Sequence, residues 1–314
     1  MRTLILKRTG LAAFQLFVVG SIVFLLVRLV PGDPARATLG DAATKEQVTQ
    51  VRSLMHLDDA LWEQYLGFWG RLLRGDLGVS LISGRTVLED LPVRIGNSLE
   101  LVLLALGIAL LIGIPLGRIA ATRANTAVDH AVTAGAVLGI SMPVFVLGTL
   151  LLLMLGVWWP VLPPERFVPF TQDPLTHLRV IVLPLITLTA ASTAVVVRMT
   201  RSAMLETLNA DFVRTARAKG VSEKLVIRRH ALRASLLPVV SASSVELTTL
   251  IGSTVLVETI FGWPGMSSLL MNAVSLRDYP VIQAVVLGTA TIVIVVNLVA
   301  DISVRFLDPR AESV

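Results

Sequence analysis

The sequence predicts an all-α integral membrane protein with six transmembrane helices. The 314 residues are 54% hydrophobic and only 16% charged, and their mean hydropathy is +0.77. A soluble domain does not expose so apolar a composition to water. Uncharged runs long enough to cross about 30 Å of hydrocarbon recur along the chain. We expect a single membrane domain over residues 1–314.

Six runs meet this length, at residues 9–27, 101–117, 131–157, 180–197, 234–257 and 279–300. The first is longer than the core of an ordinary signal peptide. It is followed by Arg28 and Pro31 rather than by a small-residue cleavage site, which indicates an uncleaved span. The fifth run is interrupted only by Glu246.

The distribution of Lys and Arg predicts the orientation of the spans. With the N-terminus inside, sixteen of the 27 basic residues lie on the inner side, ten lie on the outer side, and Arg28 ends a span. Positively charged loops stay in the cytoplasm, and the five Trp and two Tyr all fall on the outer side, as in an aromatic belt. Both termini are therefore expected in the cytoplasm.

An extracytoplasmic cap is expected after the first span, at residues 31–96. Trp62, Leu66 and Trp69 recur at i, i+4 and i+7, with Tyr65 and Phe68 beside them, which predicts an amphipathic helix. Such a helix lies at the membrane interface or packs on a partner, and we favour the interface. Turn signals then follow at residues 75–78, 83–84 and 92, and they predict a compact cap.

A polar loop is expected between the fourth and fifth spans, at residues 198–235. The stretch from residue 198 to residue 238 holds nine Lys and Arg against three acids. Residues 209–211 can cap a short helix over residues 212–219, which Gly220 ends because glycine readily adopts the left-handed conformation. Ser222 can then cap a second helix. Such a helix-turn-helix could bind DNA, but tethering to the bilayer at both ends argues against a nucleic-acid partner.

Sequence signatures of catalysis are absent. The chain has no phosphate-binding loop, no H-E-x-x-H, no G-x-S-x-G and no cysteine, and its four His are scattered. We therefore expect a protein that is not an enzyme, with no catalytic residue, no metal site and no cofactor of its own.

Residues inside the spans offer the remaining functional candidates. Glu246 is the deepest charge, and burying a charge there costs about 2.5 to 3.5 kcal/mol. It either faces a water-filled pathway or pairs inside the helix bundle, and both interpretations stay open. Glu100, Glu258 and Asp301 lie nearer span ends, where capping or solvation is expected.

The spans also hold three prolines, expected to interrupt them, and five glycines that allow close helix approach: Pro115, Pro143, Pro184, Gly107, Gly113, Gly117, Gly139 and Gly148.

The loop R-T-A-R-A-K-G-V-S-E-K-L-V-I-R-R-H-A-L-R resembles the cytoplasmic "EAA" loop of permease subunits in binding-protein-dependent ABC importers. The Gly of that pattern falls on Gly220 and its third position on Ala216, whereas Arg214 and Thr215 replace Glu and Ala. Further stretches resemble the oligopeptide, dipeptide and nickel branch, and together they cover nearly the entire chain: RLVPGDPA, LLRGDLGVSL, NSLELVLLALGIALLIGIPLG, LGISMPVFVLG, ETIFGWPGM, RDYPVIQA and LDPR.

This resemblance implies a peptide importer of the bacterial inner membrane, in which the short cytoplasmic helix docks in a groove of an ATPase subunit. Partners implied are a homologous second permease, two cytoplasmic ATPases that carry ATP and magnesium, an extracytoplasmic substrate-binding protein and membrane lipid. The coupling candidates are Asp211, Phe212, Arg214, Thr215, Ala216 and Gly220. The apolar Phe212 and Val213 are expected to be buried in the ATPase. The basic residues expected to fix the orientation of the docked helix are Arg214, Arg217 and Lys219. The pathway candidates are Glu246, Met142 and Pro143.

Other functions remain open at this point. Permeases for nickel or glutathione belong to the same branch. A secondary transporter could use Glu246 as its coupling acid, and a membrane scaffold would transport nothing. A carrier more often shows several acids or His along one path, so a single deep Glu gives it little support.

Overall fold

The computed structural model describes residues 2–29, 33–39, 43–54, 57–162 and 166–307. All regular elements within these ranges are helical, apart from one isolated β-bridge between Val79 and Thr86. The chain divides into two compact units. Unit 1 comprises residues 1–98 and 264–294, and unit 2 comprises residues 99–263 and 295–314.

Within the described ranges, five helices are long and apolar enough to cross a membrane. They contain the predicted first, second, fourth, fifth and sixth spans, and they are α1 (Arg2–Leu29), α5 (Val87–Thr122), α8 (Pro174–Leu208), α11 (Leu232–Phe261) and α13 (Tyr279–Leu307). Helix α5 already begins at Val87, so the last residues assigned to the cap are helical. Pro92, predicted to mark a turn, lies inside this helix, because tertiary context overrides the local turn signal.

The third predicted span is not one straight helix. Helix α6 (Ala127–Ser141) and helix α7 (Val144–Leu151), which continues as the π-helix η1 (Leu152–Trp158), meet at an angle of 95°. A proline disfavours the helical conformation in the preceding residue, and Met142 before Pro143 is extended at φ −89°, ψ 118°. Helices α5 and α8 continue through Pro115 and Pro184, so the prediction that these two prolines interrupt spans was wrong.

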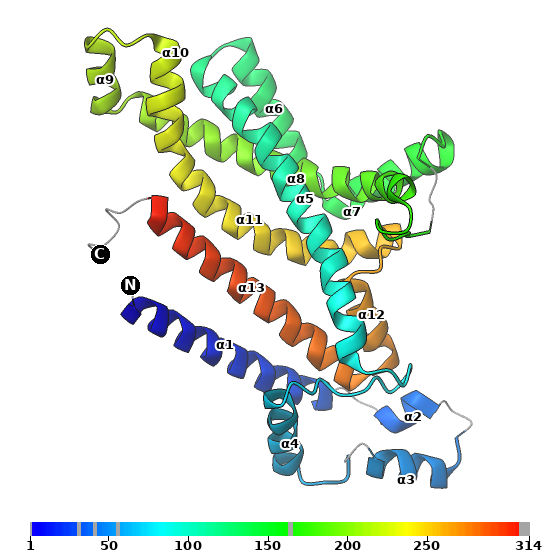
Figure 1. Cartoon of the computed structure of the whole chain (residues 1–314). Helices are drawn as coiled ribbons and strands as arrows, with labels where there is room; N and C mark the ends of the chain where they lie inside the picture. The colour runs from blue at the N-terminus through cyan, green and yellow to red at the C-terminus, as the bar shows by residue number, and fades with distance from the viewer. Residues whose placement is uncertain (1, 30–32, 40–42, 55–56, 163–165, 308–314) are drawn as a thin grey trace. The chain divides into compact units, whose positions relative to one another are not determined.

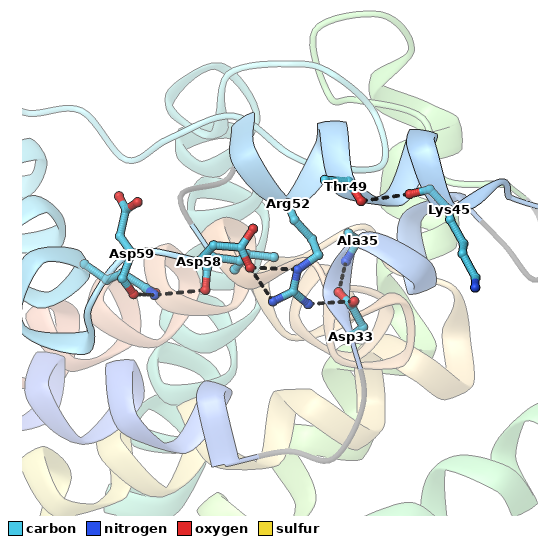
Figure 2. Close-up of polar contacts among 9 residues, drawn as sticks. Asp33, Ala35, Lys45, Thr49, Arg52, Asp58 and Asp59 are labelled. Atoms are coloured by element: carbon cyan, nitrogen blue, oxygen red, sulfur yellow. Dashed lines mark hydrogen bonds and ion pairs between the residues drawn. The ribbon is translucent and has the colours of Figure 1, made fainter.

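The segment predicted to form the cap begins with helices α2 (Pro34–Leu39) and α3 (Lys45–Leu54), which an ionic network connects. Arg52 donates one hydrogen bond to Asp33 at 2.8 Å and two to Asp58 at 3.0 and 2.7 Å (Figure 2). Burial raises the pKa of Asp33, but the hydrogen bonds from Arg52 and from the Ala35 amide outweigh it, so the net pKa lies below its usual value.

The predicted amphipathic helix is α4 (Leu61–Leu73), and its aromatic face is divided. Phe68 is buried, and Trp69 stacks on Phe17 of α1 with ring centroids 5.1 Å apart. Trp62 and Leu66 remain exposed. Helix α4 therefore packs on the first span, and the part of its apolar surface around Trp62 and Leu66 stays exposed.

The loop after α4 contains the predicted glycine turns, since Gly75, Gly78 and Gly84 all have positive φ. This loop is fixed by Asp278, which lies between α12 (Met266–Leu276) and α13. The buried Asp278 carboxylate accepts hydrogen bonds from Ser80 Oγ at 2.5 Å and from the Leu81 amide at 3.2 Å. The connection predicted between the last two spans thus contains a helix and anchors part of the cap.

The packing in unit 2 centres on α8, which lies against α6 and α11. A methyl group added at Gly117 of α5 would lie 2.6 Å from Thr200 Cβ and 2.7 Å from the Val197 carbonyl oxygen. Gly113, Gly139 and Gly148 make similarly close approaches, whereas a methyl group at Gly107 would meet nothing within 4 Å. Four of the five predicted glycines therefore mark close packing.

Two predictions concern residues that the structure does not describe in full. The closing L-D-P-R stretch extends into residues 308–314, which lie outside the described residues, as do Pro31 and Arg310. The Asp301 side chain is likewise not described.

We expect Gly117→Ala to destabilise the protein by about 1–3 kcal/mol, because the added methyl group meets a backbone carbonyl that cannot rotate away. Gly107→Ala is the matched control. It gains up to about 1 kcal/mol of helix propensity with no contact to oppose it. Thermal unfolding in mild detergent would show this difference, and equal melting temperatures for the two variants would contradict the close packing of α5 on α8.

We expect the cap around α2 and α3 to loosen at acidic pH. The pKa of Asp33 is lower in the folded protein than in the unfolded chain, so its stabilisation is complete above about pH 4 and is lost as the pH falls through the folded pKa. Hydrogen exchange of residues 33–53 should be faster in Asp33→Asn than in wild type at pH 7, and this difference should shrink below pH 4. Glu89→Gln, at an exposed acid outside the network, should exchange like wild type at both pH values; a pH-independent difference for Asp33→Asn would contradict the account.

Candidate functional site

The predicted short helix in the polar loop is α9 (Asp211–Ala218). It lies with α10 (Glu223–Leu225) at one end of the α8–α11 pair (Figure 1). Ala210 occupies the N-cap position without a side-chain hydrogen bond, and Asn209 instead donates to the Leu205 carbonyl of α8 at 3.0 Å. The predicted side-chain cap from residues 209–211 is therefore wrong, although the Asp211 charge still suits the first turn.

Gly220 ends α9 as predicted, with φ +78°. Its amide donates to the Arg217 carbonyl at 2.9 Å, and the Val221 amide donates to the Ala216 carbonyl at 3.2 Å. This pair of bonds is a Schellman motif, which requires a left-handed residue at the position of Gly220. Ser222 then stands at the predicted N-cap of α10, but its side chain makes no cap bond.

The inner face of α9 packs on the chain itself. Val213 and Ala216 are buried against Val226 of the π-helix η2 (Val226–Ala231), and Val221 covers this cluster. Val213 has no exposed surface, so the prediction that it is buried in a partner was wrong. The alternation of apolar and polar residues in an eight-residue helix does not reveal which apolar residue faces inward.

The outer face of α9 carries Asp211, Phe212 and Arg214 into solvent. Phe212 is 50% exposed, although the adjacent Val213 is fully buried. Arg214 approaches Asp211 at 3.6 Å, and the Thr215 hydroxyl donates to the Asp211 carbonyl at 2.9 Å. Of the coupling candidates, Asp211, Phe212 and Arg214 are thus presented together, whereas Ala216 packs inward and Gly220 forms the turn.

Arg217 braces the turn from within the chain. Its Nη2 and Nε donate to the two carboxylate oxygens of Glu223 at 2.7 and 3.0 Å, and its Nη1 donates to the Leu208 carbonyl at 3.3 Å. The hydrogen bonds to Glu223 raise the pKa of Arg217. Arg217 therefore connects the end of α8, α9 and α10, a role that its place among nine basic residues did not indicate.

Glu246 lies on the face of α11 that packs against α8. The buried α11 residues recur at helical spacing: Ser235, Val239, Glu246, Leu250, Ile251, Thr254, Val257 and Glu258. Ser192 of α8 donates to Glu246 Oε1 at 2.6 Å, and only 8% of Glu246 is exposed. The side chain is thus paired inside the bundle of this chain, as one of the two interpretations requires. A pathway role for Glu246 stays a prediction.

The sequence did not single out the shortest ion pair among the described residues of unit 2. Arg201 of α8 donates to both carboxylate oxygens of Asp129 on α6, at 2.6 and 2.8 Å. The buried carboxylate also accepts from the Asn125 amide at 2.9 Å. A bidentate, further hydrogen-bonded pair of this kind is geometrically specific. Its partners are 72 residues apart, so it could be found only by knowing that α6 packs on α8.

At the other end of α8, the buried His177 contacts the partly exposed Glu100 of α5. His177 Nδ1 is 2.8 Å from the Val168 carbonyl, and Nε2 is 3.0 Å from Glu100 Oε1. A carbonyl oxygen only accepts, so Nδ1 is the donor in its contact with Val168. Trp263 packs 5.6 Å from this ring and is fully buried, so it is not part of an exposed aromatic belt.

Glu258 is fully buried, which contradicts solvation, one of the two roles expected of it, and leaves capping untested. The described residues contain no group of three or more His, Asp or Glu that could hold a metal ion.

Met142 and Pro143 form the break between α6 and α7. Apolar side chains around this break remain exposed, namely Val137, Leu138, Ile140, Met142 and Phe145.

Comparisons with known proteins decide the family. The model of the binding-protein-dependent transport system inner membrane component matches residues 113–313, and the model of the N-terminal part of such components matches residues 1–82. The chain belongs to this family of ABC importer permeases. It is a multi-pass component of the inner membrane, of the dipeptide and oligopeptide type.

Three relatives illustrate the similarity. The chain is 38% identical to the dipeptide transport system permease protein DppB of Escherichia coli K12, over 99% of this chain and 98% of that protein. It is also 38% identical to the di/tripeptide transport system permease protein DppB of Pseudomonas aeruginosa, with the same coverage. Identity to the glutathione transport system permease protein GsiC of Escherichia coli is 37%, over 94% of both.

A solved structure supports the fold. A chain of the MetNI methionine ABC transporter, in an inward-facing conformation, aligns with a TM-score of 0.55. The alignment covers 70% of this chain and 97% of that chain at 18% identity. At this identity the likeness concerns the fold alone.

We expect Glu246→Gln to assemble like wild type, because the amide oxygen can accept the same hydrogen bond from Ser192. Ser192→Ala should instead destabilise the protein by about 1–3 kcal/mol, since it leaves a buried carboxylate without its donor. Thermal unfolding of the purified variants distinguishes them. Loss of expression of Glu246→Gln, with Ser192→Ala unchanged, would contradict the pairing described here.

Proposed function

We propose that the chain is the permease subunit of an ATP-driven importer and forms half of the pathway for di- or oligopeptides. The proposal is supported by the family and by the dipeptide and di/tripeptide permeases that match nearly the full chain. Glutathione is a second candidate substrate, favoured by the 37% identity to the glutathione permease. Nickel belongs to the same branch but has no specific observation in its favour.

The single observation that carries the coupling mechanism is the division of α9 into two faces. Its inner face is fixed by Val213, Ala216 and the Arg217–Glu223 pair, while Phe212 stands exposed on the outer face. An exposed aromatic anchor on a rigid short helix is suited to a groove on a partner protein. In our proposal that groove belongs to an ATPase subunit, and Asp211 and Arg214 set the register of docking.

In this proposal, the conformational change of the spans is driven by the partner bound to α9. A shift from 99:1 to 1:99 between two conformations requires roughly 5.5 kcal/mol of differential stabilisation. In the proposed assembly, two ATPases bind ATP and magnesium and supply this energy, while this chain binds no cofactor. Because α9 is braced to both α8 and α10, a displacement of α9 is transmitted to the spans rather than absorbed in a flexible loop.

The remaining assembly follows from the same proposal. A homologous permease completes the pathway, and a substrate-binding protein meets the cap and the α12 region on the outer side. Both termini and α9 lie in the cytoplasm of a bacterial cell, as the excess of Lys and Arg on that side predicts. No nucleic acid is involved.

Met142, Pro143 and Glu246 remain the candidates for the pathway. The exposed apolar side chains around the break between α6 and α7 support the first two. Glu246 would reach pathway water only when its hydrogen bond to Ser192 breaks. A fall in uptake by Glu246→Gln, at unchanged assembly, would support this role.

Uptake into proteoliposomes tests the function directly. The chain would be reconstituted with the proteins that co-purify with it, and labelled dipeptide, glutathione and nickel would be compared. Uptake of dipeptide that requires internal ATP is the expected result. Uptake by this chain alone, driven by an ion gradient, would instead identify a secondary transporter.

We expect Phe212→Ala to weaken retention of the ATPase by roughly 5- to 30-fold, the effect of removing about 1–2 kcal/mol from an aromatic anchor. The fold of the chain should not change, because this side chain is half exposed. Leu225→Ala removes a comparably exposed apolar side chain from neighbouring α10 and serves as the control. Equal retention by both variants would exclude Phe212 as the anchor.

A further inference from the structure

A groove of about 540 Å³ in unit 2 is lined by positive charge. Arg118 lies in the last turns of α5, Arg123 directly follows that helix, and Lys224 and Arg228 come from α10 and η2. Two isoleucines, Ile119 and Ile227, complete its apolar part. No acid lines this groove, and among the residues that the structure describes none forms an ion pair with any of the four cations.

The two sides of the groove are held together by packing beneath it. Ala121 of α5 and Ala231 of η2 are buried in one cluster with Met204 of α8, and Ile227 packs against them. The Thr122 hydroxyl donates to the Arg118 carbonyl at 3.0 Å within α5. This packing holds the four cations close together. Their mutual repulsion therefore cannot be relieved by moving α5 and η2 apart.

The groove lies where a membrane span ends. Arg118 directly follows Gly117, the last residue of an uncharged run, and the α5 helix stops at Thr122. Charged residues at this position stand at the depth of lipid headgroups. A second groove of about 320 Å³ shares Arg228 and adds Arg229 and Arg233, so positive charge continues beyond the first groove.

We propose that this groove binds the phosphate headgroup of an anionic phospholipid in the leaflet on the α9 side. The phosphate would offset the four unpaired cations, and the acyl chains would continue past the isoleucines into the hydrocarbon. Basic pockets between transmembrane helices are suited to anionic headgroups of this kind. An acidic surface of a partner protein fits the depth of Arg118 less well, because that residue borders the apolar run. Lipid bound here would stabilise the contact between α5 and η2. Because η2 belongs to the same loop as α9, this would also help to fix that loop.

Native mass spectrometry of the purified full-length chain tests this proposal. The protein in mild detergent would be mixed with equal amounts of phosphatidylglycerol and phosphatidylcholine. We expect selective retention of phosphatidylglycerol by wild type. The double variant R118Q/R228Q should bind it about 25-fold more weakly, at about 5-fold per cation removed.

Two further variants separate charge from fold. R118K/R228K keeps the charge and should retain the lipid, whereas R74Q/R179Q removes two exposed arginines elsewhere and should bind like wild type. Equal lipid loss in R74Q/R179Q would overturn the proposal, as would unchanged binding in R118Q/R228Q. Displacement of the lipid by an equal concentration of inorganic phosphate would indicate a site for free anions instead. Loss of the co-purifying ATPase from R118Q/R228Q, with lipid retained, would assign the groove to a protein partner.

Discussion

The packing of α8 against α11 is the contact on which the rest of unit 2 depends. The two helices bury a continuous face that includes the hydrogen bond between Ser192 and Glu246. Helix α5 approaches the same α8 through Gly113 and Gly117, and α6 approaches it through Gly139 and the Asp129–Arg201 pair. The short α9 lies on the connection between α8 and α11, so its position is set by this pair.

Rigidity around α9 connects this packing to function. The Schellman turn at Gly220, the buried Val213 and the brace from Arg217 to Glu223 leave the helix little independent freedom. What remains exposed is a small surface centred on Phe212. Force applied there by a partner would act on α8 and α11 together, as expected of a permease whose conformational change is driven from outside the chain.

Local physical chemistry explains what could be predicted from sequence. Hydropathy locates five spanning helices, because each must be apolar along its length, and Gly220 marks a turn because its backbone conformation is a property of that residue. Pro143 was correctly expected to interrupt the third span, but hydropathy does not report the direction of a helix, so the 95° angle between α6 and α7 was not predicted. The partnership of Asp129 with Arg201 and the inward side of Val213 depend on which helices pack together, which the sequence pattern does not specify.

Photo-crosslinking from α9 tests the central claim most directly. A benzoylphenylalanine placed at position 212 of the tagged chain in native membranes would be irradiated, and the products would be identified by mass spectrometry. We expect a crosslink to a cytoplasmic ATPase, and none when the same residue replaces the exposed Trp159, which follows the predicted third span on its expected outer side. Crosslinks from position 212 only to lipid or to another copy of this chain would contradict it.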